Sequence, residues 1–255
     1  MKTYLLMLPV LFTNIFLFEQ TKLDGPYKIV SGQYGPDQTS GDKHKQTTII
    51  KIFRDGYWIS AFFGDPAKPF DGSGGGTYIT NGNQYIETLN FFSWDSTAAG
   101  KTYTFNYKVQ GNNYMQEGVI NSDKYKDFVI KEQYEKITSS VPVKDASLEG
   151  VWQLQKGEWG NEKSNEGKWV GVVRIKIYAY PRFAWAQYNP ATKQFIGAGG
   201  GTYQFDGKRL TENLDYTTYD MPLNKPYELD IVKIAGKKFM QSDNNGYKET
   251  WVRLK

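Results

Sequence analysis

The amino-acid sequence predicts an all-β protein built from two tandem eight-stranded antiparallel up-and-down barrels, which follow an amino-terminal signal segment. Three observations support this prediction. Apolar and polar residues alternate in short segments bounded by Gly, Asn or Asp, no segment has the periodicity of a long amphipathic helix, and the whole pattern occurs twice along the 255 residues.

The amino terminus has the pattern of a targeting segment. Lys2 precedes residues 4–18, which carry no acidic or basic side chain, as in the core of a signal peptide. As a helix this stretch would reach about 22 Å, less than the roughly 30 Å of bilayer hydrocarbon. Residues 1–20 are predicted to be a signal peptide or an N-terminal anchor, because no small-residue cleavage pattern follows. The expected location is extracytoplasmic, periplasmic or secreted, with membrane association through residues 4–18 if the segment is retained.

An internal repeat organises the rest of the chain. The run GSGGGTY at residues 72–78 returns as GAGGGTY at residues 197–203, and this offset of 125 gives 20 identities over residues 25–95 without a gap. Two copies of one domain are therefore predicted, a first barrel at residues 25–137 and a second at 148–255. Residues 138–147, which are small and polar and include Pro142, are the expected linker.

Each copy reads as a series of short strands joined by tight turns. The pairs Asp55-Gly56 and Gly111-Asn112 are typical of β-hairpins, because these residues tolerate the positive φ of primed turns. Eight strands joined in this way suffice to close a small barrel, and a pair of open β-sandwiches is the alternative. In the first copy the expected strands are residues 26–34, 46–54, 57–64, 76–81, 84–93, 102–110, 113–120 and 127–137.

Three motifs together resemble a known family. They are GGGTY, a Tyr/Leu-x-Glu-x-Leu-x-Phe/Tyr strand after a Gly turn, and a last strand ending in ETWVRL. This combination resembles the bacterial lipocalin-like domains of secreted and membrane proteins of unknown function, here present twice. The resemblance implies a calycin-type barrel, an extracytoplasmic address and no established activity. Lipocalins proper open with Gly-x-Trp, which residues 150–152 match, whereas the first copy has Tyr27 in place of the Trp.

The same resemblance implies a structural role for four residues. In that superfamily a basic residue of the last strand packs over the opening aromatic residue, so Arg253 is expected over Trp152 and Lys136 over Tyr27. A cation over an aromatic ring contributes about 0.5 to 2 kcal/mol. We expect these pairs to close the base of each barrel without a catalytic role.

A glutamate recurs on the apolar face of one strand in both copies. Glu87 lies between Tyr85 and Leu89, and Phe91 completes a face that we expect to point inward. The second copy repeats it with Leu210, Glu212, Leu214 and Tyr216. A buried carboxylate is costly unless it is paired. Three interpretations remain open: Glu87 and Glu212 are satisfied by interior partners, they anchor a ligand, or they act as general acid and base. Glycoside chemistry would need a second inward carboxylate, and none is identified in both copies.

Aromatic residues supply the other candidates for a ligand site. The predicted ligand-binding residues are Trp58, Tyr78, Glu87 and Phe91 in the first copy and Phe183, Tyr203, Glu212 and Tyr216 in the second. The aromatic residues suit either hollow or filled barrels. Because Ser60 is replaced by Trp185, the two barrels are expected to differ in interior volume, the second being more occluded if Trp185 points inward. The glycine triplets are expected to mark a bulge or a close backbone approach.

Composition narrows the function classes. The chain has no Cys and a single His, His44, which argues against thiolate or imidazole metal sites and against Cys- or His-dependent catalysis. Its 31 Lys and Arg face 27 Asp and Glu without basic clusters, so no nucleic-acid partner is expected. No metal, cofactor or enzymatic activity is predicted. The favoured function is an exported binding protein for a small apolar or amphipathic ligand held inside the barrels. The alternative is a non-catalytic structural or interaction protein of the cell envelope with filled barrels.

Overall fold

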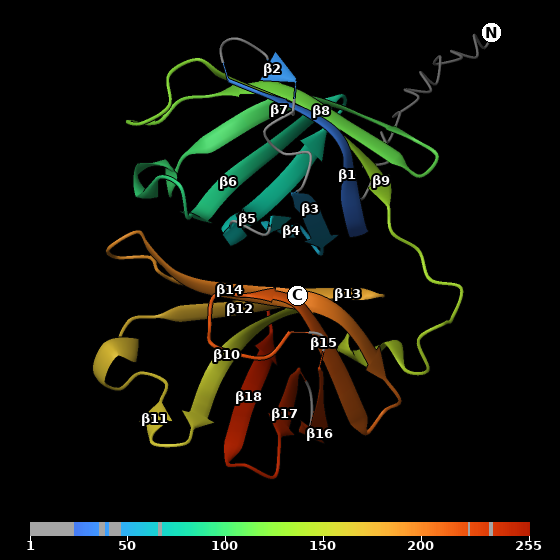
Figure 1. Ribbon diagram of the computed structural model, residues 1–255, viewed down its shortest axis with the longest axis vertical. Coiled ribbons are helices and arrows are strands. Elements are labelled where there is room, and N and C mark those ends of the chain that lie inside the picture. Colours follow the sequence, from blue (N-terminus) through green and yellow to red (C-terminus); the bar gives the residue numbers. More distant parts are fainter. Residues whose placement is uncertain (1–22, 36–38, 41–46, 66–67, 224, 235–236) are drawn as a thin grey trace, which may run out of the picture.

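In the computed structural model the chain forms two closed antiparallel barrels, one packed against the other (Figure 1). The structure describes residues 23–35, 39–40, 47–65, 68–223, 225–234 and 237–255. The predicted signal segment, residues 1–20, and His44 lie outside the described residues. Within the described part of the chain, no helix combines the length and apolar character needed to cross a membrane.

The first barrel has eight strands in sequence order. They are β1 (Gly25–Tyr34), β3 (Thr48–Arg54), β4 (Tyr57–Asp65), β5 (Lys68–Asn81), β6 (Gln84–Phe92), β7 (Thr102–Gln110), β8 (Asn113–Ile120) and β9 (Phe128–Lys136). Each strand pairs with the next, and β9 pairs back with β1, which closes the barrel. The two-residue strand β2 (Thr39–Ser40) lies beside β1, and the short 3₁₀ helix η2 (Ser96–Ala98) joins β6 to β7.

The second barrel repeats this topology. Its strands are β10 (Gly150–Trp159), β12 (Val173–Ala179), β13 (Arg182–Asn189), β14 (Gln194–Phe205), β15 (Arg209–Thr217), β16 (Pro226–Ile234), β17 (Lys238–Ser242) and β18 (Tyr247–Arg253). Closure is by β10 on β18, and β11 (Glu162–Lys163) corresponds to β2. Two further 3₁₀ helices are η3 (Ala146–Leu148), which precedes β10, and η4 (Gly167–Trp169), which precedes β12. The predicted pair of eight-stranded barrels is thus confirmed, and open sandwiches are excluded because both sheets close.

The glycine-rich run forms part of a strand that is longer than expected. The sequence predicts a strand at residues 76–81, but β5 begins at Lys68 and pairs with β4 along the run. The glycines are needed for close backbone approach at a β-bulge. A Cβ on Gly76 would lie 1.9 Å from the carbonyl oxygen of Thr88, and one on Gly201 would lie 1.8 Å from that of Asn213.

This bulge reverses the direction of two predicted site residues. Leu89 pairs with Gly76 and Phe91 with Gly75, so Asn90 is the extra residue, and the second barrel has the same shift between Gly200 and Gly201. Successive side chains in a strand alternate between faces, so one extra residue moves the side chains beyond it to the opposite face. The expectation that Phe91 and Tyr216 line the barrel interiors is therefore wrong. Both lie in the contact between the two barrels.

The contact between the barrels is an apolar interface made by equivalent faces of the two copies. Strand β3 packs on β12 and β4 on β13, as the stacked barrels show (Figure 1). Phe91 stacks on Tyr188 with ring centroids 5.3 Å apart, and Phe63 stacks on Tyr216 at 4.7 Å. The ion pair between Arg54 and the carboxylate of Glu149, at 2.7 Å, joins the two copies. The use of the same face by both copies resembles a twofold dimer interface within one chain.

In each barrel, the basic residue of the last strand lies near the aromatic residue at the start of the first strand, as expected for Arg253 with Trp152 and Lys136 with Tyr27. The Arg253 guanidinium lies 4.2 Å from the Trp152 ring centroid and donates to the carbonyl oxygens of Glu149 (2.6 Å) and Ser147 (2.8 Å). The indole of Trp152 donates to the carbonyl of Leu148 at 2.8 Å. In the first barrel the Lys136 ammonium lies 5.8 Å from the Tyr27 ring.

The interface predicts a stability effect outside the barrel interiors. Replacing Phe91→Ala should lower the free energy of unfolding by about 3 to 5 kcal/mol, because it leaves a cavity between the barrels. The matched control is Ile79→Ala, at a side chain that is 58% exposed, which should change stability by no more than about 0.5 kcal/mol. Chemical denaturation measures both. Equal effects of the two substitutions would show that the interface does not form in solution.

Candidate functional site

Each barrel encloses four polar side chains at equivalent positions. They are a lysine, a glutamate, a glutamine and a second glutamate: Lys51, Glu87, Gln116 and Glu132 in the first barrel, and Lys176, Glu212, Gln241 and Glu249 in the second. None of them is more than 7% exposed. Burial of charge is tolerated only where partners replace water, so the contacts within each set decide what the interior can bind.

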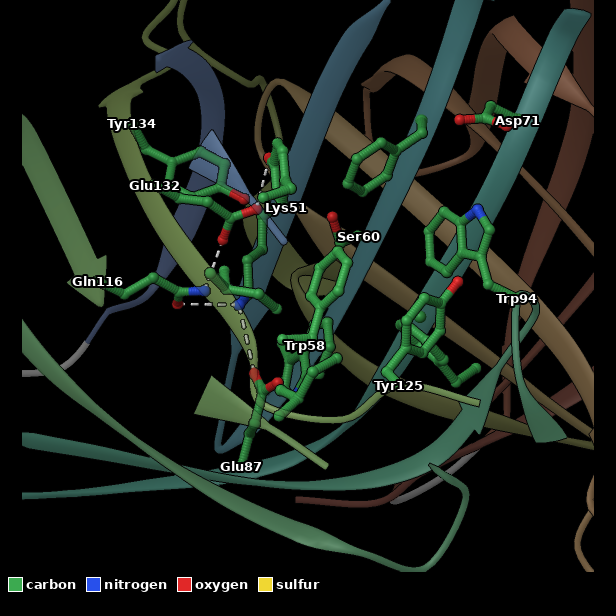
Figure 2. Close-up of a pocket in the computed structure, with 17 residues that line it drawn as sticks. Lys51, Trp58, Ser60, Asp71, Glu87, Trp94, Gln116, Tyr125, Glu132 and Tyr134 are labelled. Carbon is green, nitrogen blue, oxygen red and sulfur yellow. Dashed lines mark hydrogen bonds and ion pairs between the residues drawn. The ribbon is translucent and has the colours of Figure 1, made fainter. Parts of the chain in front are cut away.

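In the first barrel, Lys51 joins two of the other three residues. Its ammonium lies 3.3 Å from Oε2 of Glu87 and donates to Oε1 of Gln116 at 3.1 Å (Figure 2). The Tyr85 hydroxyl donates to the same Glu87 oxygen at 2.7 Å, and the Lys51 ammonium lies 4.3 Å from the Trp58 ring centroid. Glu87 thus has a charged partner and a neutral donor, as the first of the three interpretations expected.

Glu132 lies at the other end of this network. It accepts from Nε2 of Gln116 at 2.6 Å and from the Tyr34 hydroxyl at 2.9 Å, and Tyr134 supplies a further hydrogen bond. Burial raises the pKa of Glu132 above its ordinary value, and the charge of Lys51 and the two tyrosine hydroxyls only partly oppose that effect. Among the described residues of this network, the first barrel therefore has one lysine against the two buried carboxyl groups of Glu87 and Glu132.

A pocket of about 310 Å³ opens onto this network. Its lining includes Tyr34, Lys51, Trp58, Ser60, Phe62, Asp71, Glu87, Phe92, Trp94, Gln116, Tyr125, Phe128, Glu132 and Tyr134. In Figure 2, Trp94, Tyr125 and Asp71 lie across the pocket from the side that holds Lys51, Gln116 and Glu132. The indole N–H of Trp58 is buried and has no hydrogen-bond partner among the described residues. The pocket thus combines aromatic walls with a polar end and offers an unused donor.

The second barrel satisfies its polar residues differently. Lys176 lies 3.0 Å from Glu212, which also accepts from the Tyr178 hydroxyl. Glu249 forms an ion pair with Arg174, whose equivalent in the first barrel is Ile49. Burial acts to raise the pKa of Glu249, but the charges of Arg174 and Lys176 and hydrogen bonds from Tyr247 and Trp159 together lower it below its ordinary value.

Trp185 occupies the interior of the second barrel. It pairs directly with Lys176 across β12 and β13, and directly opposed residues share a face. Its ring lies 4.9 Å from the Arg174 guanidinium and stacks on Tyr219 with centroids 5.5 Å apart. The inward direction of Trp185, on which the expected difference between the barrels depended, is therefore observed. Ser60 at the equivalent position of the first barrel lines the pocket instead.

The remaining predicted site residues fall into three groups. Trp58 and Glu87 line the pocket, and Glu212 with Phe183 belongs to the interior of the second barrel, where the Lys176 ammonium lies 5.6 Å from the Phe183 ring. Tyr78 and Tyr203 pack in the aromatic cores and are not part of the pocket lining. Their rings contact Phe53 at 5.2 Å and Tyr178 at 4.9 Å, respectively.

The sequence-based interpretation missed the second inward carboxylate. Glu132 and Glu249 occupy equivalent positions, so the expectation that no second inward carboxylate exists in both copies is wrong. In the last strand the copies align at an offset of 117, the offset that pairs Tyr134 with Trp251, and not at 125. Two residues before Tyr134 and Trp251, the same offset aligns Glu132 with Glu249 and so identifies the pair. Lys51 was missed because it lies within an apolar run, residues 49–53.

Comparisons with known proteins give information on the fold and none on function. No protein family and no curated protein sequence matches the chain. Among solved structures, the uncharacterized protein YLR301w from Saccharomyces cerevisiae matches with a TM-score of 0.50 and 11% identity, over 90% of this chain and 97% of that one. Within the described residues no group of three or more His, Cys, Asp or Glu side chains is placed to hold a metal ion.

A double-mutant cycle tests the Lys51–Glu87 pair. Replacing Lys51→Met alone should destabilise the protein by about 3 to 5 kcal/mol, because the Glu87 carboxylate stays buried without its charged partner. Adding Glu87→Gln should recover most of this loss. The control Lys28→Met, at an exposed position, should change stability by no more than about 0.5 kcal/mol. Equal losses in the single and double variants, measured by urea denaturation, would contradict the pairing.

Glu132 predicts a pH dependence of stability. Because its pKa is higher in the folded state than the ordinary value of 4.5, the folded state binds the proton more tightly than the unfolded state does. The contribution is therefore fully favourable below that value and is lost as the pH rises through the folded-state pKa. The stability of the wild type should fall relative to Glu132→Gln over this range, measured by denaturation at several pH values. Glu135→Gln, at an exposed position of the same strand, serves as the control. A constant difference between wild type and Glu132→Gln would refute the shift.

Proposed function

We propose that this protein is a non-catalytic binding protein that holds a small amphipathic molecule in the pocket of its first barrel. The observation that carries the proposal is the pocket itself, in which aromatic walls lead to the buried Lys51–Glu87–Gln116–Glu132 network. Aromatic walls with a few fixed polar groups are the usual construction of a small-molecule site. The unpartnered Trp58 N–H adds a donor that a bound molecule can satisfy.

The size of the pocket supports a small ligand. At about 310 Å³ it lies at the lower end of the range of roughly 300 to 1,000 Å³ for ligand pockets. A closed barrel keeps such a site rigid, because each wall strand is hydrogen-bonded on both sides. A molecule with an aromatic or apolar body and one polar end matches the lining.

Location and family belong to the same proposal. The apolar stretch at residues 4–18 supports export, with membrane association if the segment is retained. The GGGTY and ETWVRL motifs support a relationship to the bacterial lipocalin-like domains of secreted and membrane proteins.

The second barrel supports a structural role. Trp185, Arg174 and Tyr219 occupy its interior where the first barrel has Ser60, Ile49 and Trp94. Its outer face covers the equivalent face of the first barrel. A structural or interaction role in the cell envelope is therefore the second candidate function, and it rests on this barrel.

Filling the pocket tests the binding function. The variant Ser60→Trp with Phe92→Thr copies Trp185 and Thr217 of the second barrel, and it should abolish binding while the barrels stay folded. Native mass spectrometry of gently purified protein and a thermal-shift screen of lipids, haem and short glycans detect the ligand. The control Ser140→Trp adds the same side chain at an exposed linker position and should bind as the wild type does. Empty wild-type protein without any thermal shift would count against the proposal, as would equal binding by the filled variant.

A further inference from the structure

We infer that the pocket of the first barrel takes an organic cation, an amine or guanidine with an apolar body, whose charged head pairs with Glu132. This inference rests on the proposed function and names the chemical class of its ligand. It is carried by a comparison within the chain, because the second barrel holds a cation of its own at the equivalent place.

That cation is Arg174. Its guanidinium lies 4.9 Å from the Trp159 ring centroid and 4.9 Å from that of Trp185, so it is held between two indoles. It forms an ion pair with Glu249, a carboxylate whose other donors include the indole N–H of Trp159 at 2.9 Å and the amide of Gln241 at 2.7 Å. Aromatic faces and a carboxylate are the surroundings that favour a guanidinium in a buried site.

Among the described residues, the first barrel keeps the carboxylate but has no cation in the place of Arg174. The repeat aligns Arg174 with Ile49, Glu249 with Glu132, Trp159 with Tyr34 and Trp185 with Ser60. Glu132, Tyr34 and Ser60 all line the pocket. The pocket is therefore bordered by three residues whose equivalents, Glu249, Trp159 and Trp185, surround the Arg174 head in the second barrel. A ligand with a cationic head and an aromatic body would supply both groups that the first barrel lacks.

The charges of the pocket favour the same ligand. Among the described residues that line it, Lys51 is the one basic side chain, against the buried carboxyl groups of Glu87 and Glu132. Lys51 is engaged with Glu87 and Gln116. The hydrogen-bond donors to Glu132, on Tyr34, Gln116 and Tyr134, are uncharged.

The pKa values of the two equivalent glutamates are also shifted in opposite directions. Burial raises the pKa of Glu132. At Glu249 the charges of Arg174 and Lys176, together with hydrogen bonds from Tyr247 and Trp159, outweigh burial and lower the pKa. A cationic ligand would act on Glu132 as Arg174 acts on Glu249. An anionic head would face carboxyl groups that it cannot pair with, so acids are disfavoured.

A matched set of probes tests the charge preference. The probes are 2-phenylethylamine, 2-phenylethanol and 3-phenylpropanoate, which share a phenyl body and differ in the charge of the head. Isothermal titration calorimetry of the full chain at neutral pH should show the amine binding at least about tenfold more tightly than the alcohol, the ratio that one charge-assisted hydrogen bond can supply. The propanoate should bind more weakly than the alcohol.

Two variants locate the preference in this pocket. Glu132→Gln should bring the affinity for the amine down to that for the alcohol, while alcohol binding persists. Ile49→Arg supplies the cation from the protein, as in the second barrel, and should reduce amine binding by at least about tenfold. The second variant gives a readout even if the first folds poorly. Conversely, Arg174→Ile with Trp185→Ser should create a second amine site.

The outcomes separate this inference from the function on which it rests. An alcohol that binds as well as the amine, or an amine preference that survives both Glu132→Gln and Ile49→Arg, would overturn the cation inference and leave the binding function standing. Failure of all three probes, together with a negative ligand screen, would overturn both.

Discussion

The buried lysine–glutamate pair is the interaction on which the interior of each barrel depends. Lys51 on β3 and Glu87 on β6 meet across the lumen, as Lys176 and Glu212 do in the second barrel. Such a pair adds little net stability, because desolvation offsets its attraction. Its effect is on register, since a slip of one residue in either strand would turn one charge outward and leave the other buried alone. The tyrosine hydroxyls and glutamine amides of the lumen are arranged around this fixed pair.

The glycine-rich strand and its bulge divide each sheet into an inward and an interface face. The extra residue Asn90 turns Phe91 away from the lumen, and Asp215 does the same for Tyr216. The aromatic residues beyond the bulge then cover the neighbouring barrel. Residues 49–53 of β3 are almost continuously apolar because one face of this strand lies in the barrel interior and the other in the interface. Ile49 and Phe53 belong to the first barrel's interior, whereas Ile50 and Ile52 belong to the interface.

The two copies keep one framework and use its interior differently. The second barrel holds Arg174 and Trp185 inside and balances Glu249 with a fixed cation. The first has Ile49 and Ser60 at those positions and a pocket beside them. No arginine pairs with its Glu132 in the part of the chain that the structure describes. Duplication allows this division, because one copy can be filled and contribute a stable surface while the other keeps space for a ligand.

The sequence alone determined the all-β class, the two eight-stranded barrels and the inward direction of Glu87 and Glu212, because strand periodicity, turn residues and the repeat are local or directly comparable signals. It also indicated that Ser60 and Trp185 mark a difference between the copies. Only the tertiary structure decided where Phe91 and Tyr216 point, because a bulge depends on how two strands pair and leaves the alternation of one strand unchanged. Likewise, the grouping of Lys51 with Gln116 and Glu132 required closure of the barrel. Gln116 and Glu132 are directly opposed on the neighbouring strands β8 and β9, whereas Lys51 on β3 is far from both along the chain and reaches Gln116 only inside the closed barrel.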